Sequence, residues 1–297
     1  MVSALTRFSS IALLLAMATG SGLAASGKSK PQAVKFPDMT FAIVRSAAPG
    51  CEPVCPEWIA ADGLITDSTP RAFKKVLKAM GKRQLPVLIR SPGGKVFAAI
   101  EMGRLIRARK LPVGVAQTSY TGCAPGQKTC KLPEIAKGRY QGSASSYNAY
   151  CHSACTLILA SGTQRLAGLF ATVGVHNFSA VVLKQVVFYR ERYTVVNGRK
   201  KVLSRKVTGR KTTGSYTTSK LGKSFERRVA GYLSDMGMDA ALLPLMRATP
   251  AADIHAMTAT ELLNTRILTS LTAGDTLADP KHCQGGAVPA NCIDSTP

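Results

Sequence analysis

The chain has 297 residues, of which 45% are hydrophobic and 19% are charged, and its formal net charge is +23. These proportions are those of a globular protein with one substantial hydrophobic core, and they exclude a chain that stays unfolded for lack of apolar residues. Beyond the N-terminal segment, no stretch is long enough and free enough of charge to predict a membrane span.

The N-terminus has the pattern of a secretory signal over residues 1–25. One early cation, Arg7, precedes the apolar residues 11–18, and small residues close the segment. Because the apolar run is shorter than the roughly 20 residues that cross a bilayer, a cleaved signal is favoured over an uncleaved anchor. We therefore expect a soluble periplasmic or secreted protein, with residues 26–40 as a linker to a domain over 41–270.

All eight cysteines lie beyond this signal. An even number of cysteines in an exported chain predicts disulfides, and we favour pairing between sequence neighbours. A zinc site is the alternative, but the spacings differ from those of the usual zinc ligands, so no metal or other cofactor is expected. The favoured pairs are Cys51 with Cys55, Cys123 with Cys130, Cys151 with Cys155, and Cys283 with Cys292.

The first half of the domain alternates strands and helices. Short apolar runs predict strands at residues 41–44, 58–65 and 85–89. A helix is predicted from Ser68-Thr69-Pro70 to Gly81, and another over residues 96–109, because apolar residues recur there at helical spacing.

The second half continues the same pattern. Strands are predicted at 113–116 and 171–175, and an apolar helix over 156–160 lies between them. Alternating strands and helices indicate an α/β fold with a mainly parallel sheet and right-handed crossovers. Further helices are predicted at 221–236 and 239–246.

The chain ends with one more helix and a tail. Thr258 is predicted to begin the last helix. Residues 271–297 are predicted to be an irregular tail that is held by its cysteines.

A basic segment interrupts this order. Residues 184–228 contain 14 Lys or Arg and two Glu, a net charge of +12, which is about half of the total. Asn197-Gly198 is a favoured two-residue turn, and it predicts a β-hairpin within an insertion over 187–218. The segment is either a solvated hairpin or a binding site for anionic lipid, polyanionic glycan or nucleic acid.

Two turns carry the residue types of acyl-transfer chemistry. Ser91-Pro92-Gly93-Gly94 joins a strand to a helix, and glycines there let backbone N–H groups point outward toward a developing oxyanion. Ser153 lies just before an apolar helix, where its hydroxyl can be exposed and the Ala154 N–H can serve the same purpose. Taken singly, SPGG is as well explained by an ordinary strand-to-helix turn. A serine before a helix is more commonly a capping residue than a nucleophile.

The histidines differ in their context. His176 follows a strand, and an imidazole can accept a proton from a hydroxyl near neutral pH. His152 adjoins the serine, but neighbours at a tight turn point apart, so we expect a substrate contact rather than a base. His255 and His282 have no comparable context.

At these residues the chain resembles the Clp protease proteolytic subunit and its crotonase-fold relatives. The resemblance covers about residues 41–270, and its specific parts are the SPGG turn, the helix after Ser153 and the Val-Gly-Val strand before His176. It implies repeated β-β-α units around a mainly parallel sheet, with the basic hairpin where the family has its oligomer-forming handle. The resemblance thus implies a homo-oligomer, and the basic insertion at the handle position argues against the family's stacked rings.

The resemblance also implies roles for the site residues. Ser153 would be the nucleophile and His176 the general base, and the N–H groups of Gly94 and Ala154 would form the oxyanion hole. The acidic member would come from the stretch before the last helix, where Asp253 is the choice. A strict alignment to Thr258 places Ile254 there instead, and Asp235 and Asp239 are weaker candidates.

Three functions follow, in order of preference. The first is an exported, ATP-independent serine hydrolase that acts on peptide or another acyl substrate; no ATPase partner is expected, since the family's unfoldase is cytoplasmic. The second is a non-catalytic protein that binds anionic envelope surfaces through its basic insertion. A crotonase-type coenzyme A enzyme is third, because that cofactor is cytoplasmic.

Overall fold

The computed structural model describes residues 35–127, 139–285 and 288–295. Residues Phe36–Pro297 form one compact unit, to which the following description refers. The predicted signal and Cys130, and with it the predicted Cys123–Cys130 pair, lie outside the described residues.

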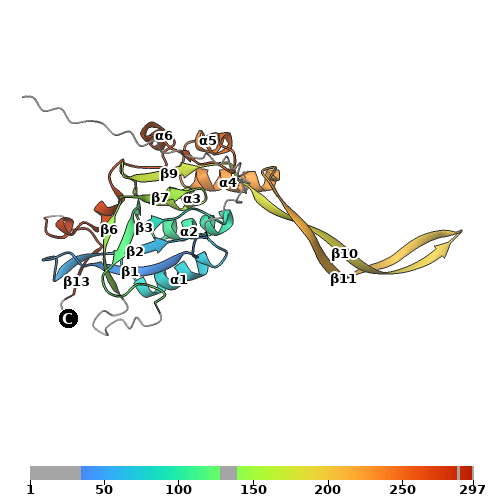
Figure 1. Ribbon diagram of the computed structural model, residues 1–297, viewed down its shortest axis with the longest axis horizontal. Coiled ribbons are helices and arrows are strands. Elements are labelled where there is room, and N and C mark those ends of the chain that lie inside the picture. Colours follow the sequence, from blue (N-terminus) through green and yellow to red (C-terminus); the bar gives the residue numbers. More distant parts are fainter. Residues whose placement is uncertain (1–34, 128–138, 286–287, 296–297) are drawn as a thin grey trace, which may run out of the picture. The chain divides into compact units, whose positions relative to one another are not determined.

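The main sheet of this unit has eight strands in the order β5-β6-β1-β2-β3-β4-β8, with β13 paired to β2 (Figure 1). The pairs β2–β3, β3–β4, β4–β8 and β1–β6 are parallel, whereas β1–β2, β5–β6 and β2–β13 are antiparallel. The strands are β1 (Thr40–Ser46), β2 (Val54–Asp62), β3 (Val87–Arg90), β4 (Val113–Val115), β5 (Gln117–Tyr120), β6 (Tyr140–Ser145), β8 (Arg165–Leu166) and β13 (Cys292–Asp294). The expected mixed α/β class with a mainly parallel sheet is confirmed.

A second, smaller sheet has the order β12-β9-β7. Its strands are β7 (Ala149–His152), β9 (Ala171–Val175) and β12 (His255–Ala256). β7 runs parallel to β9, and β12 runs antiparallel to it. The parallel pair brings the ends of β7 and β9 to the same edge, where each strand is followed by a residue singled out above.

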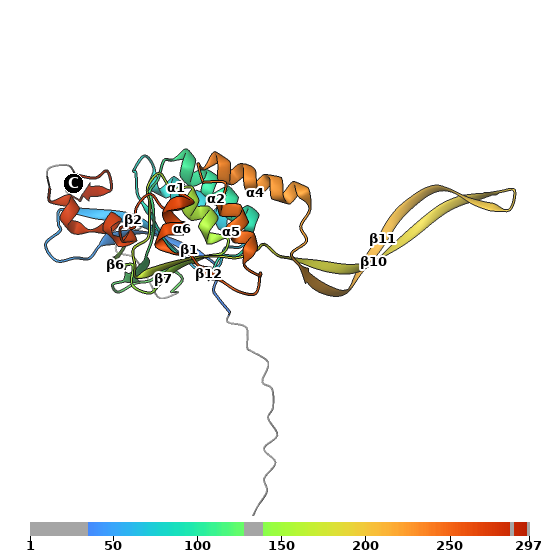
Figure 2. The ribbon, with the colours of Figure 1, turned by 90° about the horizontal axis from the view of Figure 1, so that it is seen from above.

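Six α-helices are described, and Figure 2 shows most of them on one side of the strands. They are α1 (Thr69–Met80), α2 (Val96–Ala108), α3 (Cys155–Ala160), α4 (Lys223–Asp235), α5 (Leu242–Ala248) and α6 (Ala259–Asn264). Strand β2 is buried on both faces, because Ile59 and Ala61 pack in the large core whereas Trp58 and Ala60 pack in a smaller one. The period-2 geometry of a strand explains this division.

Helix α4 packs against α3 and is hydrogen-bonded to it. The hydroxyl of Tyr232, on α4, donates a 2.6 Å hydrogen bond to the Leu157 carbonyl on α3. The same hydroxyl lies where a β-carbon at Gly103 of α2 would be, at 1.9 Å, so α2 needs a glycine there. Burial raises the pKa of Tyr232, which keeps the phenol protonated as the donor. The helix that begins next to Ser153 is therefore fixed in the core.

Strands β10 (Ala180–Val196) and β11 (Arg199–Thr218) form a long twisted ribbon that pairs only within itself (Figure 1). The two-residue turn is at Asn197-Gly198, where both residues have positive φ, 48° and 71°. Positive φ at both positions is the type I′ geometry that matches the twist of the strands. The ribbon begins seven residues before the expected insertion start of 187 because residues 180–186 pair with the end of β11.

The structure departs from the sequence expectations at short strands. β5, β6 and β7 were not predicted, because each has only four to six residues and little apolar alternation. The tail is not wholly irregular, since β13 pairs with β2 and the Asn291 side chain donates to the Glu57 carbonyl at 3.2 Å. Tertiary pairing, which a local pattern does not reveal, orders these segments.

Three of the predicted disulfides are present: Cys51–Cys55, Cys151–Cys155 and Cys283–Cys292. None of the helices in the described part of the chain is long and apolar enough to cross a membrane.

Candidate active site

Ser153 occupies a sharp turn between β7 and α3. Its φ is +56°, a left-handed conformation that costs free energy in a non-glycine residue and is concentrated at functional turns. Its N–H donates to the Gly174 carbonyl of β9 at 2.8 Å, and its carbonyl accepts from Thr156 Oγ1 at 2.7 Å. The backbone on both sides of the serine is therefore held, and the side chain is partly exposed.

The disulfide Cys151–Cys155 spans this turn. One cysteine lies on β7 and the other begins α3, and both are completely buried. The cross-link closes the chain two residues before and two residues after Ser153, so it limits how far the strained turn can relax.

The SPGG turn lies directly against the serine turn. Ser91 and Cys151 form an isolated parallel β-bridge through their main chains. A β-carbon at Gly93 would lie 2.7 Å from Ser153 Cβ and 3.0 Å from the Ala154 nitrogen. Both glycines have positive φ, 101° at Gly93 and 136° at Gly94. Only glycine combines this backbone conformation with so close an approach.

The two N–H groups predicted to form the oxyanion hole have no hydrogen-bond acceptor among the described residues. Within the described residues, the N–H groups of Gly94 and Ala154 donate no hydrogen bond, whereas the Gly93 N–H is bonded to Ser91 Oγ at 3.1 Å. Two backbone donors on adjoining turns beside a serine hydroxyl are what a tetrahedral oxyanion requires. Gly93 was expected only as part of the SPGG turn, and its close packing against Ser153 was not anticipated.

His176 follows β9, and the parallel register brings it to the serine turn. His152 pairs with Gly174, so the next residues on the two strands, Ser153 and Val175, are level and His176 is one residue further on. The described contacts contain no hydrogen bond between Ser153 Oγ and His176. The ring's Nδ1 lies 2.8 Å from the Asn177 carbonyl oxygen.

That contact determines the tautomer of His176. A carbonyl oxygen only accepts, so Nδ1 carries the proton and donates it, which leaves the lone pair on Nε2. The ring is thus held in the form that can accept a proton through Nε2. A main-chain carbonyl has no signature in the sequence, which is why Asn177 was not anticipated.

Asp253 forms no hydrogen bond with His176 among the described residues. The β9–β12 pairs are His255 with Val175 and Ala256 with Gly174, and Asp253 lies outside them, in a bend before β12. Asp253 is exposed, and its carboxylate forms no hydrogen bond or ion pair with a described residue. The assignment of Asp253 as the acidic member gains no contact from this geometry.

A histidine with a carboxylate partner exists elsewhere in this region. His255 Nε2 lies 2.9 Å from Glu261 Oε2, and Glu261 also completes a capping box with Thr258 at the start of α6. The Thr258 backbone hydrogen bond, and then His255, lower the pKa of Glu261. The pair joins β12 to α6, and we assign it a structural role.

His152 lies on the same face of the small sheet as His176. Its Nε2 is 3.0 Å from Thr172 Oγ1, and its ring packs 5.2 Å from that of Tyr150. Burial, and then the electrostatic effect of the nearby His176, lower the pKa of His152. His152 is therefore neutral near pH 7, and its imidazole lies beside the serine as an uncharged contact.

The lowered pKa predicts an acid-sensitive fold. Because the unfolded chain then binds more protons than the folded one, the free energy of unfolding should fall as the pH drops below about 6.5, the ordinary histidine value. The fall should end once the pH has passed the lower pKa of folded His152. Urea unfolding between pH 7 and pH 5 measures this slope.

His152→Gln should flatten that slope, whereas the matched control His282→Gln, at an exposed histidine, should leave it unchanged. An unchanged slope in His152→Gln would contradict the prediction. Carboxylates such as Glu261 titrate below this pH window, so they do not obscure the result.

The described residues contain no group of three or more His, Cys, Asp or Glu side chains that could hold a metal ion.

Comparison with known proteins adds little to this geometry. No family model and no curated protein matches the chain. Two solved structures of a 1510-N membrane-bound stomatin-specific protease are similar to it. An alanine mutant of that protease is 13% identical, with a TM-score of 0.37 over 71% of this chain and 75% of that chain. Another alanine mutant, in complex with a substrate peptide, is 13% identical, with a TM-score of 0.38 over 73% of this chain and 75% of that one. At these TM-scores the likeness carries no argument about activity.

Proposed function

We propose that the chain is an exported serine hydrolase, of the peptidase type, that acts through an acyl-enzyme on Ser153. The observation that carries the proposal is the strained conformation of Ser153, φ +56°, at a strand-to-helix turn whose neighbours are two free backbone donors. A capping serine has no need of a left-handed backbone, because N-cap residues take extended φ and ψ. Strain held by a disulfide and a packed helix indicates a position that is maintained for chemistry.

The residues divide the reaction between them. His176 Nε2 takes the proton of Ser153 Oγ as the oxygen attacks the substrate carbonyl carbon, and a C–O bond forms. The N–H groups of Gly94 and Ala154 bind the oxyanion of the tetrahedral intermediate. The His176 proton passes to the leaving amine as the C–N bond breaks, and water then hydrolyses the ester by the reverse proton path.

The Asn177 carbonyl takes the orienting role in this scheme. It holds the Nδ1 proton, so the imidazole presents Nε2 without a carboxylate partner. Catalytic hydrogen bonds are often long or misaligned before substrate binds, which accommodates the absence of a Ser153–His176 bond among the described contacts.

Export is supported by the three disulfides, because disulfides persist in oxidising compartments. The buried Cys151–Cys155 bond next to Ser153 would then require oxidative folding for a formed site. An unfoldase partner driven by ATP plays no part in the proposal.

A fluorophosphonate probe tests the proposal directly. Residues 26–297, folded with their disulfides, should be labelled covalently, and Ser153→Ala should abolish the labelling. The matched control Ser219→Ala removes an exposed hydroxyl outside the site and should label like the parent chain. Folded protein that is not labelled, or labelling that survives Ser153→Ala, would refute the hydrolase.

A further inference from the structure

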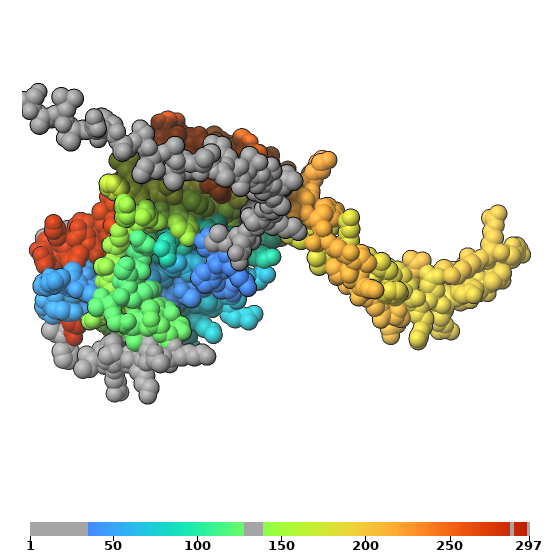
Figure 3. All heavy atoms as spheres, in the orientation of Figure 1, coloured from blue at the N-terminus to red at the C-terminus, as the bar shows by residue number. Residues whose placement is uncertain are grey.

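The ribbon formed by β10 and β11 is left without a packing partner in the described structure. Its strands pair along their whole length, yet nearly every residue from 183 to 217 is exposed (Figure 3). A two-stranded ribbon is only marginally stable in water by itself. We therefore expect a binding partner to cover part of the exposed surface of this ribbon.

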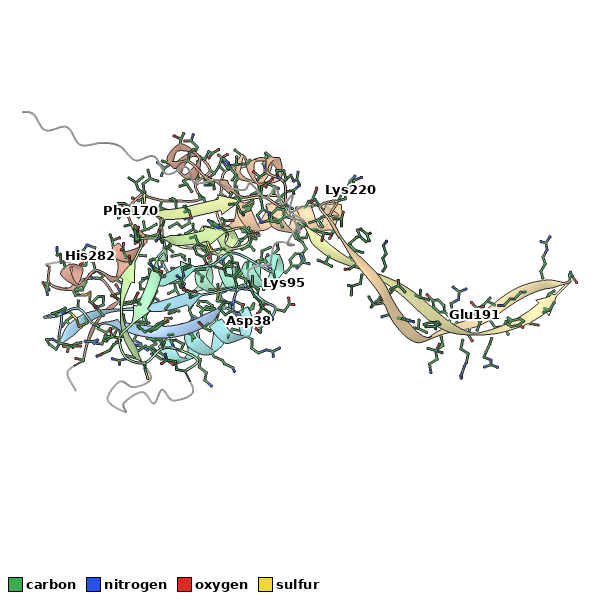
Figure 4. All side chains as sticks on the ribbon, viewed as in Figure 1. Asp38, Lys95, Phe170, Glu191, Lys220 and His282 are labelled. Atoms are coloured by element: carbon green, nitrogen blue, oxygen red, sulfur yellow. A yellow bond between two sulfur atoms is a disulfide. The ribbon has the colours of Figure 1, made fainter. Side chains whose placement is uncertain are left out.

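The distal ribbon, defined here as residues 189–207, concentrates two kinds of side chain (Figure 4). Seven are cations, against the single carboxylate of Glu191, which gives a net charge of +6. Seven others are large apolar or aromatic side chains that are 43% to 63% exposed. The cations are Arg190, Arg192, Arg199, Lys200, Lys201, Arg205 and Lys206. The apolar side chains are Tyr189, Tyr193, Val195, Val196, Val202, Leu203 and Val207.

The pairing register sorts these side chains onto two faces. Directly paired residues share a face, and successive residues along β10 point to opposite faces. The pairs Tyr189–Val207 and Tyr193–Val202 therefore lie on one face together with Val195. The pair Arg190–Lys206 lies on the opposite face. Near its turn the ribbon is thus amphipathic.

The apolar face also holds cations close to its aromatic rings. Lys200 Nζ lies 4.4 Å from the centroid of the Tyr193 ring, and the Arg205 guanidinium lies 5.0 Å from that of Tyr189. Glu191 bonds both cations, at 2.8 Å and 2.6 Å, and these bonds lower its pKa, so it stays ionised. Tyrosine rings beside long basic side chains suit a boundary between apolar chains and charged headgroups.

We propose that the distal ribbon docks on a bilayer surface of anionic phospholipid. Its apolar face enters the boundary between headgroups and acyl chains, and its cations bind the phosphates. The cations of the opposite face also attract the anionic surface, although more weakly, because the Debye length at 0.1 M salt is about 10 Å.

Charge and exposed apolar surface favour an anionic bilayer over two other binding partners, a second copy of the chain and a soluble polyanion. A second copy would bring two ribbons of net charge +6 together, which repel each other. A soluble polyanion satisfies the cations but leaves seven exposed apolar side chains in water. An anionic bilayer satisfies the cations together with the apolar side chains of the docking face. The proposal is independent of the hydrolase, since it uses no residue of the Ser153 site.

Vesicle sedimentation tests the docking with residues 26–297. The chain should bind vesicles that contain phosphatidylglycerol and should not bind vesicles of phosphatidylcholine alone. The triple variant Arg199→Ser, Lys200→Ser, Lys201→Ser should bind about 100-fold more weakly, as expected for three cations near an anionic surface. The triple variant Tyr193→Ser, Val195→Ser, Val202→Ser should also lose at least about tenfold, because apolar burial contributes to interfacial binding.

The matched control removes three exposed cations from α1 and its end, Lys75→Ser, Lys78→Ser, Lys82→Ser, and should keep parental binding. Equal loss in this control, or no binding by the parent chain, would overturn the proposal. A second contrary result would be that the variant with three apolar substitutions binds vesicles as well as the parent chain and that heparin fully displaces the parent chain from them. That result would indicate a soluble polyanion as the ligand. A change of molecular mass in solution on ribbon substitution would indicate a second copy instead. Thermal unfolding of each variant verifies that the sheets remain folded.

Discussion

Glu57→Gln is expected to lower the free energy of unfolding by about 3–5 kcal/mol, the usual consequence of removing one partner from a buried ion pair. Glu57 is fully buried on β2, and its carboxylate contacts three guanidinium groups. Arg139 is 3.0 Å away and Arg45 is 3.3 Å away, and Arg83 is in hydrogen-bond contact. Arg45 would keep its pair with Glu52 at 2.8 Å, whereas Arg83 and Arg139 have Glu57 as their carboxylate partner among the described residues and would lose it.

The loss would be large for a domain, because total stabilities are about 5–15 kcal/mol. Urea unfolding with intact disulfides measures it. The matched control is Glu101→Gln, whose pair with Lys74 is more than half exposed on both sides. Exposed pairs contribute about 1 kcal/mol or less, so equal effects of the two substitutions would show that the Glu57 cluster is not a structural cross-link.

His176→Gln is expected to slow labelling of Ser153 by a fluorophosphonate about 10²–10⁴-fold, the range that a general base contributes. The glutamine side chain fills a similar volume but has no lone pair with comparable basicity. The second-order rate constant of labelling measures activation of the nucleophile without requiring a known substrate.

Asp253→Asn tests the third member of the site in the same assay. Replacing the orienting acid of a triad costs about 10⁴-fold, whereas the Asn177 carbonyl in this scheme predicts a rate close to that of the parent chain. Similar losses in Asp253→Asn and His176→Gln would assign the orienting role to Asp253 and contradict the carbonyl. Both variants must retain the thermal unfolding of the parent for the comparison to count.

Local patterns were sufficient for the regular elements that carry the site. The helix after Ser153 and the strand before His176 appear within one residue of the expected bounds, because each is an apolar run with clear ends. The Asn197-Gly198 turn could also be predicted from the sequence, because only a few residue types accept positive φ at two successive positions. Three of the four favoured pairs between neighbouring cysteines are present, and Cys123–Cys130 stays a prediction.

Which residues of the candidate site lie close together could be seen only in the tertiary structure. The strand β7, which sets the register of Ser153 against β9, is too short to show a period of its own. Gly93 packs on Ser153 across 60 residues of chain, and the Asn177 carbonyl reaches His176 through a main-chain atom that is the same for every residue type. Asp253 was chosen from the sequence order of a family, and it lies exposed in a bend before β12, outside the β9–β12 pairs.

The sequence by itself determined the alternation of strands and helices, the basic hairpin, and the serine, histidine and cysteine residues that make chemistry possible. Those features depend on hydrophobic period and on the conformational preferences of single residues, which act over a few positions. The tertiary structure decided which donors lie beside Ser153, which atom orients His176, and which side chains share a face of the ribbon. Such relations depend on register between distant strands, and a shift of one residue would place each side chain on the opposite face.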